Sequence, residues 1–271
     1  LEELLPEAVR RQSIVRYDPD RAKVVGVLQE SYLDLLLREE PHMAVDPIAA
    51  GRVLADALAV DARAWFERDE AAASWLARLE LIRQAMPEAD WPLLDDAALR
   101  SVLENACAGK RSLEEARSVS LVSWLNGLLA PRQQHWLDEQ MPTHLELPSG
   151  RRSRIHYQPG QPPVVKARVQ DCFGWRETPR LASGRIAVVL HLLAPNDRPV
   201  QITGDLASFW NTTYHQVRKD LRGRYPKHAW PEDPWTAPPG RPRRPAGPPP
   251  PPPPPPAADS RGGPRRKPDA S

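Results

Sequence analysis

The spacing of apolar residues changes twice along the chain, and each change predicts a different architecture. Short apolar runs at residues 13–19 and 22–29 flank Asp18-Pro19-Asp20, which predicts a β-hairpin, and residues 32–40 fit either a strand or a helix. From Asp46 to Glu139 the apolar residues recur at helical spacing, and after Pro142 the period moves toward two. We therefore predict an α+β protein.

The helical stretch carries start and stop signals. Asp46 is a capping residue and Pro47 suits a first helical position, which predicts a helix with Ile48, Val53, Leu54 and Leu58 on its apolar face. Asp95 and Asp96 precede another helix, and Pro87 ends an earlier one. The further helices are expected over residues 70–86, 97–107, 112–129 with a break near Ser118, and 131–140.

The residues after Pro142 predict a small sheet with a helix packed on it. Two strands flank Pro148-Ser149-Gly150, and three more are expected at residues 162–170, 185–194 and 198–203. A helix then opens at Gly204-Asp205, with Asp205 as its N-cap. We divide the chain into residues 1–44, 45–140, 141–236 and 237–271, which are expected to be a β-rich part, a helical region, an α+β region and a disordered Pro/Arg-rich tail.

Charge is unevenly distributed over the 271 residues, whose formal net charge is +2. Residues 1–140 carry a net charge of −9, residues 141–236 carry +6, and the remainder carries +5. Attraction for a phosphate backbone therefore belongs to the second half of the chain. The tail contains nine consecutive prolines, Pro248–Pro256, so its alternatives are a solvated extension, added affinity for RNA, and a site for a proline-binding protein partner.

The segment after Asp205 combines cations with aromatic rings. Leu206, Phe209, Trp210, Val217 and Leu221 would form the buried stripe of a helix, followed by an extended arm that Pro226, Pro231 and Pro234 keep from being helical. One interpretation is an interface for single-stranded nucleic acid, in which cations contact phosphates and Tyr225 or Trp230 stacks on a base. The other is that the rings pin the arm to the domain. The candidate RNA-binding residues are Arg218, Lys219, Arg222, Arg224, Tyr225, Lys227 and Trp230. A second candidate group, at the predicted hairpin, is Arg151, Arg152 and Arg154, with a solvated charged face as its alternative.

Two stretches carry a family resemblance. The sequence VRKDLRGRYPKHAWPEDP, preceded by RPVQITGDLASFW, resembles the carboxyl end of HrpB-type bacterial DEAH-box ATP-dependent RNA helicases. LARLELIRQAMPEADWPLLDDAALRSVLE, followed by GKRSLEEA, resembles a region further upstream in that family. The resemblance implies that residues 45–236 are the family-specific C-terminal domain and that residues 1–44 end an oligonucleotide-binding-type barrel. It also implies upstream motor domains that use ATP and Mg²⁺ to move along RNA.

The sequence itself lacks the chemistry of a helicase motor. It has no GxxxxGK[ST] loop and no DEAH motif, and in the tempting Gly109-Lys110-Arg111-Ser112 stretch Glu104 replaces the loop's first glycine. No spacing suggests a catalytic set, and the two cysteines suggest neither zinc nor a disulfide. We expect no cofactor and no enzymatic activity in this chain, which starts at Leu1 and fits a carboxyl-terminal fragment or a truncated reading frame.

These observations lead to a functional hypothesis with one alternative. We expect an accessory region that guides single-stranded RNA or other nucleic acid, or regulates the motor domains, which are its expected partners. The alternative is a protein-interaction or structural module without RNA contact. No run of 18 apolar residues and no basic secretion signal is present, so we expect no membrane partner and a cytoplasmic location.

Overall fold

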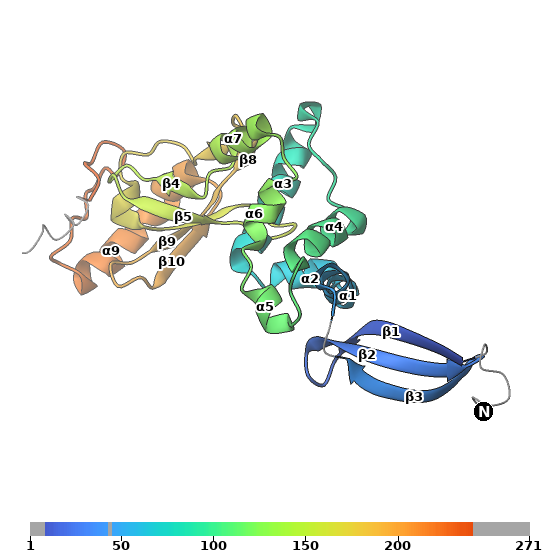
Figure 1. Ribbon diagram of the computed structural model, residues 1–271. Coiled ribbons are helices and arrows are strands. Elements are labelled where there is room, and N and C mark those ends of the chain that lie inside the picture. Colours follow the sequence, from blue (N-terminus) through green and yellow to red (C-terminus); the bar gives the residue numbers. More distant parts are fainter. Residues whose placement is uncertain (1–8, 43–44, 241–271) are drawn as a thin grey trace, which may run out of the picture. The chain divides into compact units, whose positions relative to one another are not determined.

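A three-stranded antiparallel sheet opens the structure. In the computed structural model, which describes residues 9–42 and 45–240, β1 (Val9–Asp18), β2 (Lys23–Tyr32) and β3 (Leu35–His42) pair in sequence order (Figure 1). The carboxylate of Asp18 accepts hydrogen bonds from the backbone of Asp20 and Arg21, which closes the predicted turn. The hairpin is confirmed and residues 32–40 contribute a strand. Within the described residues this sheet stays open and does not close a barrel.

Seven helices follow in the described chain, one more than the pattern predicted. They are α1 (Pro47–Ala59), α2 (Ala62–Glu67), α3 (Glu70–Ala85), α4 (Asp96–Cys107), α5 (Leu113–Arg117), α6 (Leu121–Asn126) and α7 (Pro131–Gln140). Asp46 caps α1 as expected, but Ile48 is 63% exposed, so its place on the apolar face was wrong. The buried face is made by Ala50, Gly51, Leu54 and Ala55 instead. Small residues can form this face because α1 lies very close to α4: a Cβ on Gly51 would be 2.6 Å from the Cys107 carbonyl oxygen.

A buried cation joins α3 to α7. Arg78 is 5% exposed, and its Nε donates to the Met141 carbonyl at 2.6 Å, while its Nη2 is 2.6 Å from the Asp138 carboxylate. Met141 follows the last turn of α7, so the guanidinium satisfies a carbonyl at the end of that helix. An arginine on a predicted helix is usually exposed, and periodicity did not indicate this one as a core residue.

The second sheet has five strands of mixed direction. Its order is β10 (Pro199–Thr203), β9 (Val189–Leu193), β6 (Val164–Arg168), β5 (Arg152–His156) and β4 (His144–Glu146), and only β6 and β9 run parallel. β7 (Arg180–Leu181) and β8 (Ile186–Ala187) form a separate two-stranded ribbon. The α+β prediction is confirmed.

The two faces of this sheet differ in burial. Ile155, Val165, Leu190 and Leu192 are at most 1% exposed and belong to the hydrophobic core. Their neighbours along each strand, among them Arg154, Lys166 and His191, point the other way and reach solvent. The sheet therefore has one core face and one outward face.

The last helical segment and the arm complete the core. Asp205 accepts from the Ser208 N–H at 2.9 Å and caps α8 (Leu206–Ser208), as predicted; a π-helical turn at Phe209–Thr213 leads into α9 (Tyr214–Arg224). Phe173, Trp210 and Tyr214 pack with ring centroids 5.2–6.0 Å apart. All described residues belong to one compact unit. The predicted tail is outside the described residues from 241 onward, and residues 237–240 are held by a bond from Gly240 N–H to the Gln170 carbonyl.

Candidate nucleic-acid interface

The exposed side of α9 carries a stripe of basic residues. His215, Lys219 and Arg222 are exposed and stand four and three residues apart, which places them on one side of a helix. Tyr214 and Leu221 occupy the opposite side and are buried. The helix therefore anchors itself by one face and presents cations on the other, as the sequence predicted.

Arg218 does not belong to that exposed stripe. Its Nε donates to the Trp230 carbonyl at 2.9 Å, and its Nη2 is 2.9 Å from Glu232, so the guanidinium spans the turn between α9 and the arm. Only 20% of the side chain is exposed. The phosphate contact predicted for Arg218 competes with these two bonds, and in this structure the residue holds the arm in place.

Trp230 is also committed to the fold. It is 7% exposed, and its Nε1 donates to the Tyr225 carbonyl at 2.9 Å. A base cannot stack on a ring whose faces are covered, so the stacking role is wrong for Trp230 in this conformation, and the interpretation that the ring pins the arm describes it. Tyr225 is half-buried and meets the His228 ring edge-on at 6.2 Å between centroids. Its stacking role stays a prediction.

Four of the predicted cations remain available at this end of the domain. We call Lys219, Arg222, Arg224 and Lys227, all exposed, the α9 basic surface. In the part of the chain that the structure describes, none of them lies within ion-pair distance of a carboxylate. Because Arg222 and Arg224 are in the last turn of α9, they also stabilise the negative end of the helix dipole.

The three arginines of the second predicted group, Arg151, Arg152 and Arg154, do not share one environment. Arg151 follows the Gly150 turn and lies 3.4 Å from Asp171, a carboxylate that is 8% exposed, so it serves an internal pair. Arg152 and Arg154 are exposed on β5, and Arg154 is 3.1 Å from Glu70 of α3. Among the described contacts, no hydrogen bond or ion pair joins this group to the α9 basic surface.

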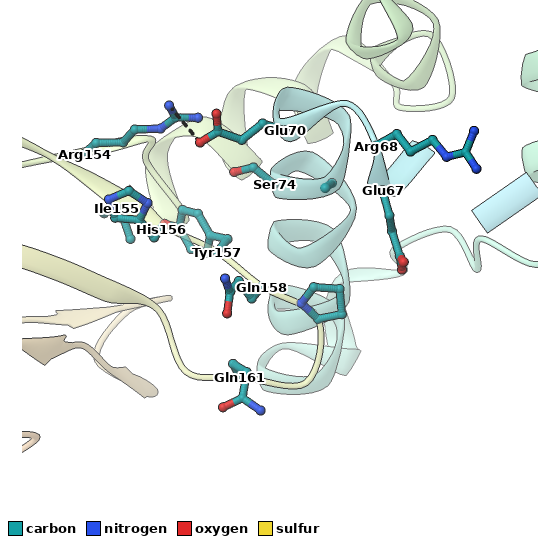
Figure 2. A pocket seen from close by; sticks show the side chains of 12 residues that line it. Glu67, Arg68, Glu70, Ser74, Arg154, Ile155, His156, Tyr157, Gln158 and Gln161 are labelled. Carbon is teal, nitrogen blue, oxygen red and sulfur yellow. Dashed lines mark ion pairs between the residues drawn. The ribbon is translucent and has the colours of Figure 1, made fainter. Parts of the chain in front are cut away.

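A pocket of about 470 Å³ lies where β5 faces α3. Figure 2 shows Arg154 reaching Glu70 on one side of the pocket. Tyr157, Gln158 and Gln161, on the loop that follows β5, also line it. The Tyr157 hydroxyl is held by the Pro142 carbonyl at 2.7 Å, and burial raises the pKa of this phenol. Ser74 and His156 both line this pocket, but no described hydrogen bond joins them as the nucleophile and base that a hydrolytic site requires.

The Gly109–Ser112 stretch has a structural role. Ser112 caps the five-residue helix α5, and the Arg111 carbonyl accepts from the Val24 N–H of β2 at 2.7 Å. The Arg111 side chain donates to the Val45 carbonyl. These residues connect the first sheet to the helices, and they do not fit a loop that cradles phosphates, which needs free backbone donors.

Metal and thiol chemistry have little support in the described residues. No cluster of three or more His, Cys, Asp or Glu side chains able to hold a metal occurs there. Both cysteines are buried, and burial raises the pKa of the Cys107 thiol to about 11.

No helix in this part of the chain is both long and apolar enough to cross a membrane.

Comparison with known proteins identifies the family. Residues 102–234, which include α9 and the arm, match the family model described as ATP-dependent helicase C-terminal, HrpB_C. These residues therefore belong to the HrpB_C domain family. ATP-dependent RNA helicase HrpB of Escherichia coli strain K12 is 40% identical over 179 residues, which are 62% of this chain and 22% of that protein. The chain thus spans about a fifth of the length of the curated relative it matches.

Two solved structures share the fold of this HrpB C-terminal region. The crystal structure of the E. coli DExH-box NTPase HrpB matches with a TM-score of 0.69 and 31% identity, covering 89% of this chain and 30% of that one. The crystal structure of E. coli DEAH/RHA helicase HrpB matches with a TM-score of 0.62 and 30% identity, covering 85% and 30%. The resemblance read from the carboxyl motif is confirmed.

Sequence reasoning missed one group in the HrpB C-terminal domain. His156 of β5, Lys166 of β6 and His191 of β9 join Arg154 on the outward face of the five-stranded sheet. The alternation of buried and exposed positions within each strand was a signal for their orientation. Their grouping depends on strand order, because β6 and β9 are neighbours although about twenty residues separate them.

Proposed function

We propose that this C-terminal domain holds single-stranded RNA for its helicase, with the α9 basic surface contacting the phosphate backbone. The observation that supports the proposal is the exposure of Lys219, Arg222, Arg224 and Lys227 without a described acidic partner. A cation without an ion pair can contact a phosphate without first breaking a bond to a carboxylate. The counterions that are released from RNA then favour binding. The negative first half of the chain would keep the strand on the basic side.

The parent protein supplies the energy in this proposal. The curated relative is named an ATP-dependent RNA helicase, and it is far longer than this chain. We infer that ATP and Mg²⁺ bind to motor domains outside these residues and that the domain steers RNA toward or away from them. We expect no nucleotide loop among the described residues, since Gly109–Ser112 contributes to the junction between β2 and α5.

Charge reversal on α9 tests the proposal. The double variant Lys219→Glu/Arg222→Glu should bind a labelled single-stranded oligouridylate at least tenfold more weakly at low salt, and its salt dependence should fall by about 1.4 in log–log slope for two lost phosphate contacts. Fluorescence anisotropy over a range of salt concentrations measures both. Arg218 is left unchanged, because its loss would release the arm.

A matched variant controls for net charge. Arg63 and Arg132 are exposed on α2 and α7, so Arg63→Glu/Arg132→Glu makes the same change in the acidic half and should bind nearly as the unaltered chain does. Equal weakening in both variants would mean that only overall charge matters. No RNA binding by the unaltered chain at low salt would favour the alternative, a module that contacts proteins alone.

A further inference from the structure

A row of basic side chains crosses the outward face of the five-stranded sheet. His144 pairs with Arg154 across β4 and β5, and Lys166 pairs with His191 across β6 and β9. Ile155 pairs with Val165 across β5 and β6, and this register brings Arg154 beside Lys166 at the next position. We call His144, Arg154, Lys166 and His191 the sheet row. Neighbouring strands are about 4.8 Å apart, so the row extends over roughly 14 Å.

The positive charges of the sheet row repel one another. Like charges on neighbouring strands destabilise a sheet, and here Arg154 and Lys166 stand side by side with a histidine at each end. His156 lies two residues after Arg154 on the same face of β5. Burial is the main reason that its pKa is below the ordinary value. The charges of Lys166, Arg154 and His191 lower it further, and Glu70 partly offsets them. The local potential is positive, and an anion would relieve it.

Two other cations on this face, Arg168 and Arg152, each have an acidic residue nearby, so the row carries the least compensated positive charge. Arg168 makes two bonds of 2.9 Å to Asp197. Arg152 has the acidic Glu146 opposite it in the β4–β5 register, which lowers the net charge there. The row itself meets one described carboxylate, Glu70 on α3, at 3.1 Å from Arg154. That pair is exposed on both sides, 47% and 74%, and such pairs contribute little and exchange readily.

We propose that the sheet row is a second phosphate-binding surface for single-stranded RNA, separate from the α9 basic surface. It rests on the proposed function, that the domain binds such a strand, and adds where a second stretch of it lies. The pocket beside Arg154 extends the surface: Ser74, Gln158 and Gln161 offer hydroxyl and amide groups that can donate to or accept from a base edge (Figure 2). A polyanion suits the row better than a protein partner, since the face supplies few exposed large apolar groups; Ile202 on β10 is one of them.

Removing two charges of the row tests the proposal. Arg154→Gln/Lys166→Gln in the full 271-residue chain should weaken binding of a labelled oligouridylate roughly fivefold at low salt, with a smaller salt slope. The control Arg63→Gln/Arg132→Gln removes two exposed cations from α2 and α7 and should leave affinity within a factor of two. Unchanged near-ultraviolet circular dichroism checks the fold of each variant.

A gain of affinity provides a test that misfolding cannot imitate. Glu70→Gln removes the carboxylate that, among the described residues, competes for Arg154. RNA should therefore bind two- to threefold more tightly, and this gain should vanish in the background of Arg154→Gln. Glu67→Gln, at an exposed position lining the same pocket, is the matched control for a lost acid.

The outcomes separate this inference from the proposed function. If Lys219→Glu/Arg222→Glu weakens binding while the sheet-row variant matches its control, the sheet row is not a binding surface and the α9 proposal stands. If only the sheet-row variant weakens binding, the second surface is supported and the α9 assignment fails. If the unaltered chain binds no oligouridylate at low salt, both are overturned.

Discussion

Arg218 and Tyr214 hold the carboxyl-terminal arm against α9. Arg218 binds the Trp230 carbonyl and Glu232, and the Tyr214 hydroxyl donates to the Pro231 carbonyl at 2.9 Å. Proline lacks a backbone donor, so the arm cannot fasten itself through a regular ladder and depends on such side chains. A cationic or aromatic residue that suggests an RNA contact in the sequence can thus be used to hold the arm in place.

The Tyr214 phenol should make the domain sensitive to alkali. Burial raises the pKa of Tyr214 to about 12 from its ordinary 10.0. Because the unfolded chain loses this proton first, the phenol's contribution to stability is complete below pH 10 and is lost between pH 10 and 12. Chemical denaturation should therefore show the unaltered chain about 1 kcal/mol more stable than Tyr214→Phe at pH 8, through the lost hydrogen bond, and this difference should shrink or reverse toward pH 12. A difference that stays constant with pH would contradict the argument.

At the level of elements, the helix starts were the most predictable features. Asp46, Asp95 and Asp205 each accept a hydrogen bond from a first-turn N–H, at 2.8–2.9 Å, as their positions before apolar stripes indicated. α2 was missed because six residues provide too little periodicity. The face of α1 was misread at Ile48 because the close approach to α4 requires small residues, and a pattern of large apolar residues does not report that contact.

Asp95 and Asp96 make a matched pair for testing a cap. Asp95 accepts from the Ala98 N–H at 2.8 Å, whereas Asp96 is the first residue of α4 and acts only through the helix dipole. Asp95→Ala should lower the free energy of unfolding by about 1 kcal/mol, and Asp96→Ala by about 0.3 kcal/mol. Urea denaturation followed by circular dichroism measures both. Equal losses would show that the cap bond contributes nothing beyond charge.

At the scale of the whole molecule, charge is separated along the chain. The helical part is acidic and the part with the five-stranded sheet is basic, and the basic part presents cations on two elements, α9 and the outward sheet face. This arrangement suits a domain that lets a polyanion approach from restricted directions. Residues 102–234 match the HrpB_C family model, and the curated relative is named an ATP-dependent RNA helicase.

The purified 271-residue chain should not hydrolyse ATP. The phosphate-loop and DEAH motifs are absent from the sequence, and Gly109–Ser112 is occupied by the junction with β2. Phosphate release measured with and without oligouridylate should stay at the background of a mock purification. Turnover that co-purifies with the chain and is lost in Lys110→Ala would overturn this view.

The sequence by itself determined the change from strands to helices and back to strands, the capping aspartates, the charge separation and the family, because these depend on local spacing and on long motifs. Tertiary structure alone decided which cations are free. Arg218 and Lys219 are adjacent in sequence, yet one clamps the arm and the other faces solvent. It also decided that Arg154, Lys166 and His191 meet across strands, since sheet order joins residues that chain order separates.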